Sequence, residues 1–237
     1  ADQGMPRAQC NLAWCYENGK GVLRNSGEAA RWYRQAADQG DPRGLFNMGI
    51  CCKYGRGVQR DLPEAVRWYR KAVEAGSVSA LCNLGVCYEL GEGVDRDPAE
   101  AARLYRMAAQ QRDPAAQCNL GDLYESGLGV EQSWTEAVRW YRQAADQGYP
   151  RAICSLGVCC EFGHGMEKDV NRAAEFYRQA AERGDEVAAC NLGYLYELGR
   201  GVKQSWTEAA KWYQQSAEQG YPRAQYHLAW CCEHGKG

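Results

Sequence analysis

Small, aromatic and polar positions recur along the chain at one fixed interval. A tyrosine returns every 36 residues, and so does a pair of glycines separated by a single residue. The tyrosines are Tyr33, Tyr69, Tyr105, Tyr141, Tyr177 and Tyr213. The second glycines of the pairs are Gly21, Gly57, Gly93, Gly129, Gly165, Gly201 and Gly237. A strict period of this length, without insertions or deletions, indicates a repeat protein.

Each repeat predicts two helices. In the first repeat, helix A is expected over residues 6–18, because Pro6 suits a first helical position and Gly19 suits a helix end. Helix B is expected over residues 26–38, with Asn25 as its N-cap. The cap position is always Asn, Asp or Ser, at Asn25, Asp61, Asp97, Ser133, Asp169 and Ser205. A glutamate three residues after the cap predicts a capping box in every repeat except the one that carries Arg172.

A glycine follows helix B in nearly all repeats, and Arg112 is the exception. A single pair of helices cannot bury its own apolar face, whereas stacked pairs share a continuous core. The sequence therefore predicts an all-α solenoid over residues 1–237. We expect six full repeats from about 5–220 and an orphan helix A at 221–237. Because the pattern starts and stops mid-repeat, we expect the chain to be a fragment of a longer array.

The repeat resembles that of the Sel-1-like repeat (SLR) family, whose relatives are the tetratricopeptide repeats. The sixth repeat shows the pattern in Ala188, Leu192, Gly193, Tyr196, Gly199, Gly201, Val202, Ala209, Trp212, Tyr213, Ala217 and Gly220. The resemblance implies an α/α right-handed superhelix that acts as an adaptor or scaffold. It also implies that the A helices line the concave side and the B helices the convex side.

Charge argues against two classes of partner. The chain has 28 basic and 30 acidic residues, and this balance does not suit binding to nucleic acid by bulk electrostatics. No apolar run approaches the roughly 20 residues that a membrane span needs. We therefore expect a protein partner, with neither nucleic acid nor membrane involved.

All 13 cysteines fall in the A helices, where other repeats carry core residues such as Leu123 and Leu195. They are interpreted as small buried hydrophobes. Some secreted members of the family tie helix A to helix B by disulfides, but helix B of this chain has no cysteine. Bridges between neighbouring repeats stay open. The cysteines favour a reduced, cytoplasmic protein, with secreted or periplasmic locations as alternatives.

Candidate chemistry is sparse. His227, Cys231 and His234 are spaced so that they could hold a metal, but Cys231 fills a register that is leucine elsewhere, and we expect no metal. No serine–lysine pair, G-x-S-x-G, H-E-x-x-H or phosphate-binding loop is present. We therefore expect no enzymatic activity and no cofactor, although some cysteine-rich relatives carry a β-lactamase label. The acid register that includes Glu17 and Glu197 is assigned to surface pairing and capping.

Helix geometry places residues 7, 11, 14 and 18 of each helix A on one stripe. By analogy with tetratricopeptide proteins, this stripe would bind an extended peptide: asparagine amides would pair with its backbone and arginines would clamp its carboxylates. The candidate partner-binding residues are Arg7, Asn11, Trp14, Arg43, Asn47, Tyr54, Asn83, Asn119, Asp122, Arg151, Asn191, Tyr194 and Arg223.

Two alternatives stay open. The asparagines could bond neighbouring helices instead of a ligand, and the array could be a structural spacer within a larger protein. The arginines of the B helices, such as Arg31 and Arg67, are interpreted as a solvated convex face. Finally, the last helix exposes Leu228 and Trp230, so end-to-end association of chains is a further hypothesis.

Overall fold

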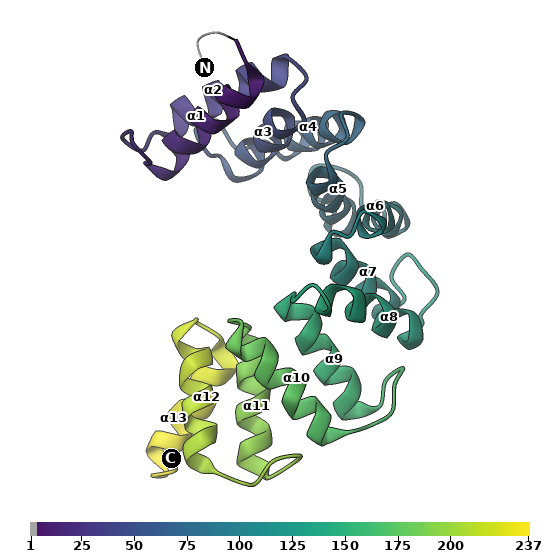
Figure 1. Cartoon of the computed structure of the whole chain (residues 1–237), viewed down its shortest axis with the longest axis vertical. Helices are drawn as coiled ribbons and strands as arrows, with labels where there is room; N and C mark the ends of the chain where they lie inside the picture. The colour runs from purple at the N-terminus through teal and green to yellow at the C-terminus, as the bar shows by residue number, and fades with distance from the viewer. Residues whose placement is uncertain (1–3) are drawn as a thin grey trace. The chain divides into compact units, whose positions relative to one another are not determined.

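The computed structural model describes residues 4–237, and this part of the chain is entirely helical, with 13 helices and no strand (Figure 1). The A helices are α1 (Pro6–Asn18), α3 (Pro42–Tyr54), α5 (Val78–Leu90), α7 (Pro114–Ser126), α9 (Pro150–Phe162), α11 (Glu186–Leu198) and α13 (Pro222–Glu233). The B helices are α2 (Ser26–Asp38), α4 (Leu62–Glu74), α6 (Pro98–Gln110), α8 (Trp134–Ala145), α10 (Val170–Glu182) and α12 (Trp206–Glu218). Their order confirms the predicted solenoid of helical pairs.

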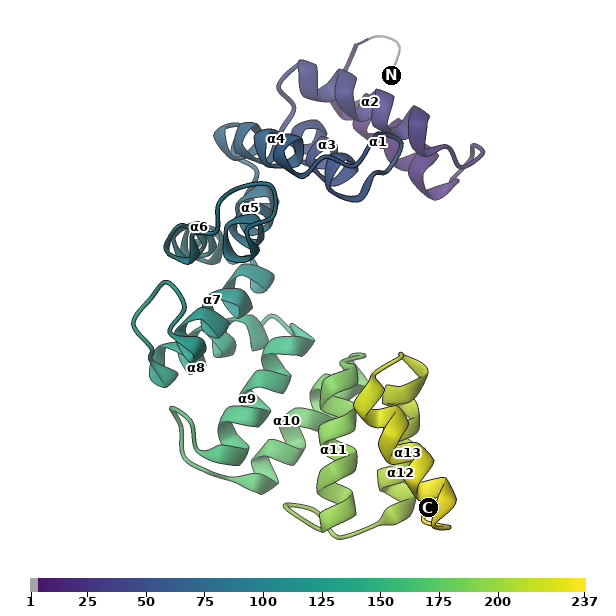
Figure 2. The ribbon, with the colours of Figure 1, turned by 180° about the vertical axis from the view of Figure 1, so that it is seen from behind.

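The chain forms two compact units. The first contains α1–α6 and the start of α7, up to Ala116, together with Leu128–Val130. The second contains the rest of α7, from Gln117, and α8–α13. Within each unit, consecutive helices pack side by side in chain order (Figure 2). A helices contact the B helix that follows them, as in the pairs α1–α2 and α11–α12.

The cap residues of the B helices behave as predicted, but the capping box is only half formed. Asn25 accepts from the backbone N–H of Glu28 at 3.1 Å, and the other cap residues do the same. The N–H of Asn25, however, donates to the Tyr16 carbonyl of helix A. The glutamate is therefore free for another partner, and Glu28 pairs with Arg31 at 2.9 Å.

The glycines of the loops serve two different needs. Gly21 and Gly57 both have positive φ, as expected for these turns. Gly57 also lies directly against the backbone of Ser26 in the preceding repeat, where a Cβ would collide with the carbonyl group. No such neighbour surrounds Gly21. From the second repeat onward, the second glycine of the pair thus permits contact between repeats, which the turn argument alone does not reveal.

The acid register, which is the position of Glu17 in each repeat, has a different role from the one expected. Most of the buried tyrosines donate a hydrogen bond from the hydroxyl to the glutamate of their own helix A, at 2.6–3.0 Å, in the pairs Tyr33–Glu17, Tyr105–Glu89, Tyr141–Glu125, Tyr177–Glu161 and Tyr213–Glu197. These bonds join the two helices of a repeat in its core, so the assignment to surface pairing and capping was wrong for them. The carboxylate satisfies a hydroxyl that burial would otherwise leave without a partner.

The second repeat departs from this arrangement, because Lys53 stands in the acid register. The Tyr69 hydroxyl consequently has no hydrogen-bond partner. Lys53 instead reaches Glu92 of the next repeat at 2.7 Å. Glu17 and Arg56 occupy the corresponding positions one repeat earlier and are 3.0 Å apart, so the second pair has the same geometry with its charges exchanged.

The cysteines are free thiols, and almost all of them are buried or half-buried, which confirms their interpretation as core residues. Burial raises the pKa of Cys51 to about 12, since the uncharged thiol is favoured in the core. Cys232 is the one exposed cysteine among the described residues. The structure contains no bridge between neighbouring repeats.

Candidate protein-interaction surface

The A helices lie closer together than the B helices. Within the units, α1 contacts α3 and α9 contacts α11, whereas no comparable contact joins two B helices in the described chain. A stack that is tighter on one side curves toward that side. The exposed stripe of the A helices therefore lines the inner side of each unit, and we refer to this stripe as the A-helix surface.

Large apolar side chains are exposed along the A-helix surface. In the first unit, Trp14, Tyr54 and Leu90 are 51%, 56% and 60% exposed. In the second unit, Phe162 and Leu198 stand at the register of Tyr54 and Leu90 and are also exposed. A folded chain rarely leaves a regular row of such residues in water, and rows of this kind mark interaction sites.

The asparagines of the stripe are not used as a structural ladder. Asn11, Asn47 and Asn191 form no side-chain hydrogen bond with any described residue, and Asn83 donates only to the Ser79 carbonyl of its own helix, at 3.1 Å. Asn119 differs, because it accepts from Arg151 of the next repeat at 3.0 Å. Most of these amides thus retain hydrogen-bonding capacity at the surface.

The arginines of the stripe fall into two groups. Arg7 and Arg43 are exposed, and Arg43 contacts only the Asp41 carboxylate at its own helix start, at 3.3 Å. In the second unit, Arg151 forms an ion pair with Asp122 of the preceding repeat. Arg223 lies 5.5 Å over the Tyr194 ring, again between neighbouring repeats. The first unit therefore offers the less engaged guanidinium groups.

The ion pair between Arg151 and Asp122 is also visible in the pKa of the arginine. Burial alone would lower the pKa of Arg151, but the nearby Asp122 carboxylate outweighs that effect and raises it. Asp122 accepts a second hydrogen bond from the buried Tyr141 hydroxyl at 2.7 Å. This carboxylate is thus held from two sides and is part of the packing between repeats.

The histidines of α13 do not come together around a metal. His227 stacks on the Tyr213 ring, with centroids 4.8 Å apart, and lies 3.5 Å from Glu197. His234 stacks instead on Trp230, at 4.2 Å. No three His, Cys, Asp or Glu side chains in residues 4–237 are grouped as metal ligands.

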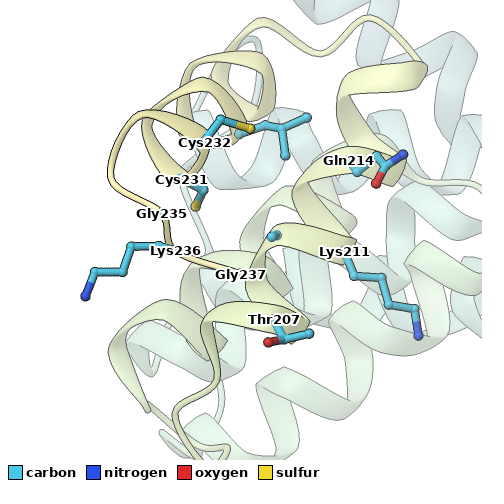
Figure 3. A pocket seen from close by; sticks show the side chains of 10 residues that line it. Thr207, Lys211, Gln214, Cys231, Cys232, Gly235, Lys236 and Gly237 are labelled. Atoms are coloured by element: carbon cyan, nitrogen blue, oxygen red, sulfur yellow. The ribbon is translucent and has the colours of Figure 1, made fainter.

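A pocket of about 580 Å³ lies between α12 and α13 (Figure 3). Its lining includes Leu228, Cys231 and Cys232 from α13 and Ala210 from α12, while Lys211 and Gln214 stand at its edge. Sequence reasoning identified α13 as an exposed end but did not reveal this pocket.

Comparisons with known proteins agree with the repeat architecture. The Sel1 repeat pattern matches residues 6–41, 42–77, 78–113, 114–149, 150–185, 187–221 and 222–237. No match is found among curated proteins. No helix of the described residues is both long and apolar enough to cross a membrane.

Solved structures show the same fold. A protective antigen of uropathogenic Escherichia coli, which displays an SLR fold, is 36% identical with a TM-score of 0.84; the alignment covers 99% of this chain and 50% of that one. The chain thus spans about half the length of this relative. A Sel1 repeat protein from Oxalobacter formigenes is 32% identical with a TM-score of 0.86, over 90% and 86% of the two chains. An immunity protein from Pseudomonas aeruginosa is 18% identical over 92% and 82%, with a TM-score of 0.63, and shows likeness of fold alone.

Proposed function

The chain belongs to the Sel1 repeat family, and from this premise we propose that it is a protein-interaction module that binds an extended segment of a partner along its A-helix surface. Folds of this kind commonly serve as interaction scaffolds. The exposed apolar side chains Trp14, Tyr54 and Leu90, one on each of the first three A helices, are the observation that carries the proposal. One such side chain on each helix matches a partner that presents side chains at intervals along an extended backbone.

The surface combines three kinds of contact in the first unit. Trp14 and Tyr54 offer apolar area, Asn11 and Asn47 offer amides that lack partners in the described chain, and Arg43 offers a positive charge. An amide can donate and accept at once, which suits the backbone of an extended chain. The aromatic side chains would then act as anchors, because such residues dominate binding free energy at interfaces.

The proposal is tested with a peptide selected from a random displayed library on the wild-type protein. Its Kd is then measured against an Asn11→Ala, Asn47→Ala variant and against a control variant, Arg31→Ala, Arg67→Ala, which alters the B helices. We expect the first variant to bind about tenfold more weakly, a loss of roughly 1.4 kcal/mol, and the control to match the wild type. Both variants are first shown to be folded by circular dichroism.

Equal affinity of the wild type and the asparagine variant would contradict the proposal, as would a loss confined to the control. The module is proposed to act without catalysis. Turnover of the β-lactam nitrocefin by the purified protein, abolished by a single substitution, would instead favour a hydrolase.

A further inference from the structure

One repeat breaks the pattern at two positions that lie one helical turn apart. The third residue after the cap of helix B is glutamate in five repeats and Arg172 in the remaining one. Four residues later, Phe176 stands where four other repeats carry tryptophan. The proposed function involves neither Arg172 nor Phe176, and both residues lie on α10.

The two departures line a pocket of about 260 Å³ between α8, α9 and α10. Arg142 from α8 and Arg172 from α10 are part of its wall, together with Phe176. Ile153 and Leu156 from α9 form an apolar floor, and both are buried. All of these residues belong to the second unit.

Arg142 and Arg172 are both exposed. Neither Arg142 nor Arg172 forms an ion pair with any described residue, and the Arg172 guanidinium lies 5.4 Å over the Phe176 ring. Asp146 also lines the pocket, but it forms no ion pair with either arginine. Glu175 follows Arg172 by three residues and likewise remains unpaired with it.

Other repeats show a pairing that this repeat does not form. Where the pattern is intact, the glutamate three residues after the cap binds an arginine of the same helix, as Glu64 binds Arg67 at 2.9 Å. Glu136 does the same with Arg139 at 3.1 Å, in the helix that precedes the pocket. In α10 the two charges are exchanged, because Arg172 stands at the glutamate position and Glu175 at the arginine position, and the two side chains do not pair.

We propose that this pocket binds a carboxylate supplied from outside the array. Two guanidinium groups present planar sets of N–H donors, which match the two oxygens of a carboxylate. The apolar floor offers contact to the carbon chain that carries the carboxylate. The pocket volume admits a short chain that ends in a carboxylate, such as an acidic side chain or a small dicarboxylate. The site involves other residues than the A-helix surface and does not depend on it.

The test uses two probes on the whole chain, glutarate and an acetylated, amidated tetraglutamate peptide, with isothermal titration calorimetry at low ionic strength. The Arg172→Glu variant introduces the residue that the five regular repeats carry at this position. A Lys203→Glu variant makes the same change in net charge on an exposed loop of the same unit. We expect Arg172→Glu to weaken binding of at least one probe by tenfold or more, with Lys203→Glu within about twofold of the wild type.

Each outcome decides the proposal. Binding of the peptide but not glutarate would support the proposal and assign the carboxylate to an acidic protein segment, and the reverse would support it with a free carboxylate as the source. Absence of binding to the wild type by both probes would overturn the proposal, as would an equal loss in the two variants, which would indicate general electrostatics. An Arg142→Gln variant gives an independent check, since Gln214 stands at the equivalent position; unchanged binding by it would also overturn the proposal.

Discussion

At the scale of single residues, the exceptions to the repeat say the most about what each position needs. Arg112 replaces the glycine after helix B and is the one non-glycine residue with positive φ in the described chain, at 65°. Its regular counterpart Gly40 has a φ of 79° and open space around it. The position therefore demands a left-handed backbone and no particular contact.

We expect Arg112→Gly to stabilise the protein. A left-handed conformation costs a side-chain-bearing residue about 1–2 kcal/mol, and part of the gain is offset by the greater freedom of glycine in the unfolded chain, so the net increase in the free energy of unfolding is about 0.5–1 kcal/mol. Urea unfolding measures it. The reverse substitution Gly40→Arg serves as control and should destabilise; a loss of stability on Arg112→Gly would show that the arginine makes a contact of its own.

Buried thiols make stability sensitive to alkaline pH. Burial, with a smaller contribution from the Asp122 carboxylate, raises the pKa of Cys118 to about 12, from an ordinary value of 9.0. The unfolded chain therefore releases its proton first. The stabilising effect is complete below about pH 9 and is lost as the pH rises from about 9 toward 12.

Removal of this thiol should make the pH dependence less steep. Within the alkaline window, one such group changes the free energy of unfolding by up to about 1.4 kcal/mol per pH unit. Cys118→Ala should thus lower the slope between pH 9 and 10, measured by urea unfolding in the presence of a reductant. An unchanged slope would mean that the thiol titrates alike in both states. The alanine's smaller volume lowers stability at every pH and does not affect the comparison of slopes.

At the scale of elements, the loop between helix A and helix B connects repeats as well as helices. Gly57 meets the backbone of Ser26 from the preceding repeat, while Gly21 has nothing near its missing Cβ. Their φ angles are 72° and 73°, so the two positions differ in surroundings and not in conformation. They form a natural pair for separating backbone strain from contact between repeats.

Gly57→Ala should destabilise the protein by about 2 kcal/mol more than Gly21→Ala. Both substitutions place a side chain at positive φ, at a cost of about 1 kcal/mol, but only the first forces two packed backbones apart. Chemical unfolding of the two variants in parallel gives the difference. Equal losses would indicate that the loop moves freely away from α2.

At the scale of the whole molecule, end-to-end association through α13 stays a prediction of the sequence. Tyr226 and Cys232 are exposed on this helix, and Leu228 and Cys231 line the pocket that α13 forms with α12. A second chain bound at α13 would cover these residues.

We expect the sedimentation coefficient to rise with protein concentration under reducing conditions. A Cys232→Glu variant places a charge at the exposed edge of the pocket and should shift association to higher concentration, because burial of an unpaired carboxylate is costly. Lys203→Glu provides a control that introduces a glutamate outside the pocket lining. A concentration-independent monomer would contradict the expectation.

The sequence by itself determined the helices, their ends and their period, because proline, cap residues and glycine act through neighbours within a few residues. Asn25 and Gly19 could be assigned without knowledge of the rest of the chain. The exposed stripe of the A helices was also predictable, since helical periodicity sets which side chains share a face. Whether Asn11 or Arg43 contacts a ligand stays a prediction.

Only the tertiary structure decided contacts between residues that are distant in the chain. It assigned Glu17 to the Tyr33 hydroxyl and Lys53 to Glu92, because these distances depend on how helices stack and not on local preference. It likewise showed that Arg172, which interrupts the capping pattern, lines a pocket. The helices of each repeat follow from local sequence, but the contacts described here arise where neighbouring repeats and helices pack together.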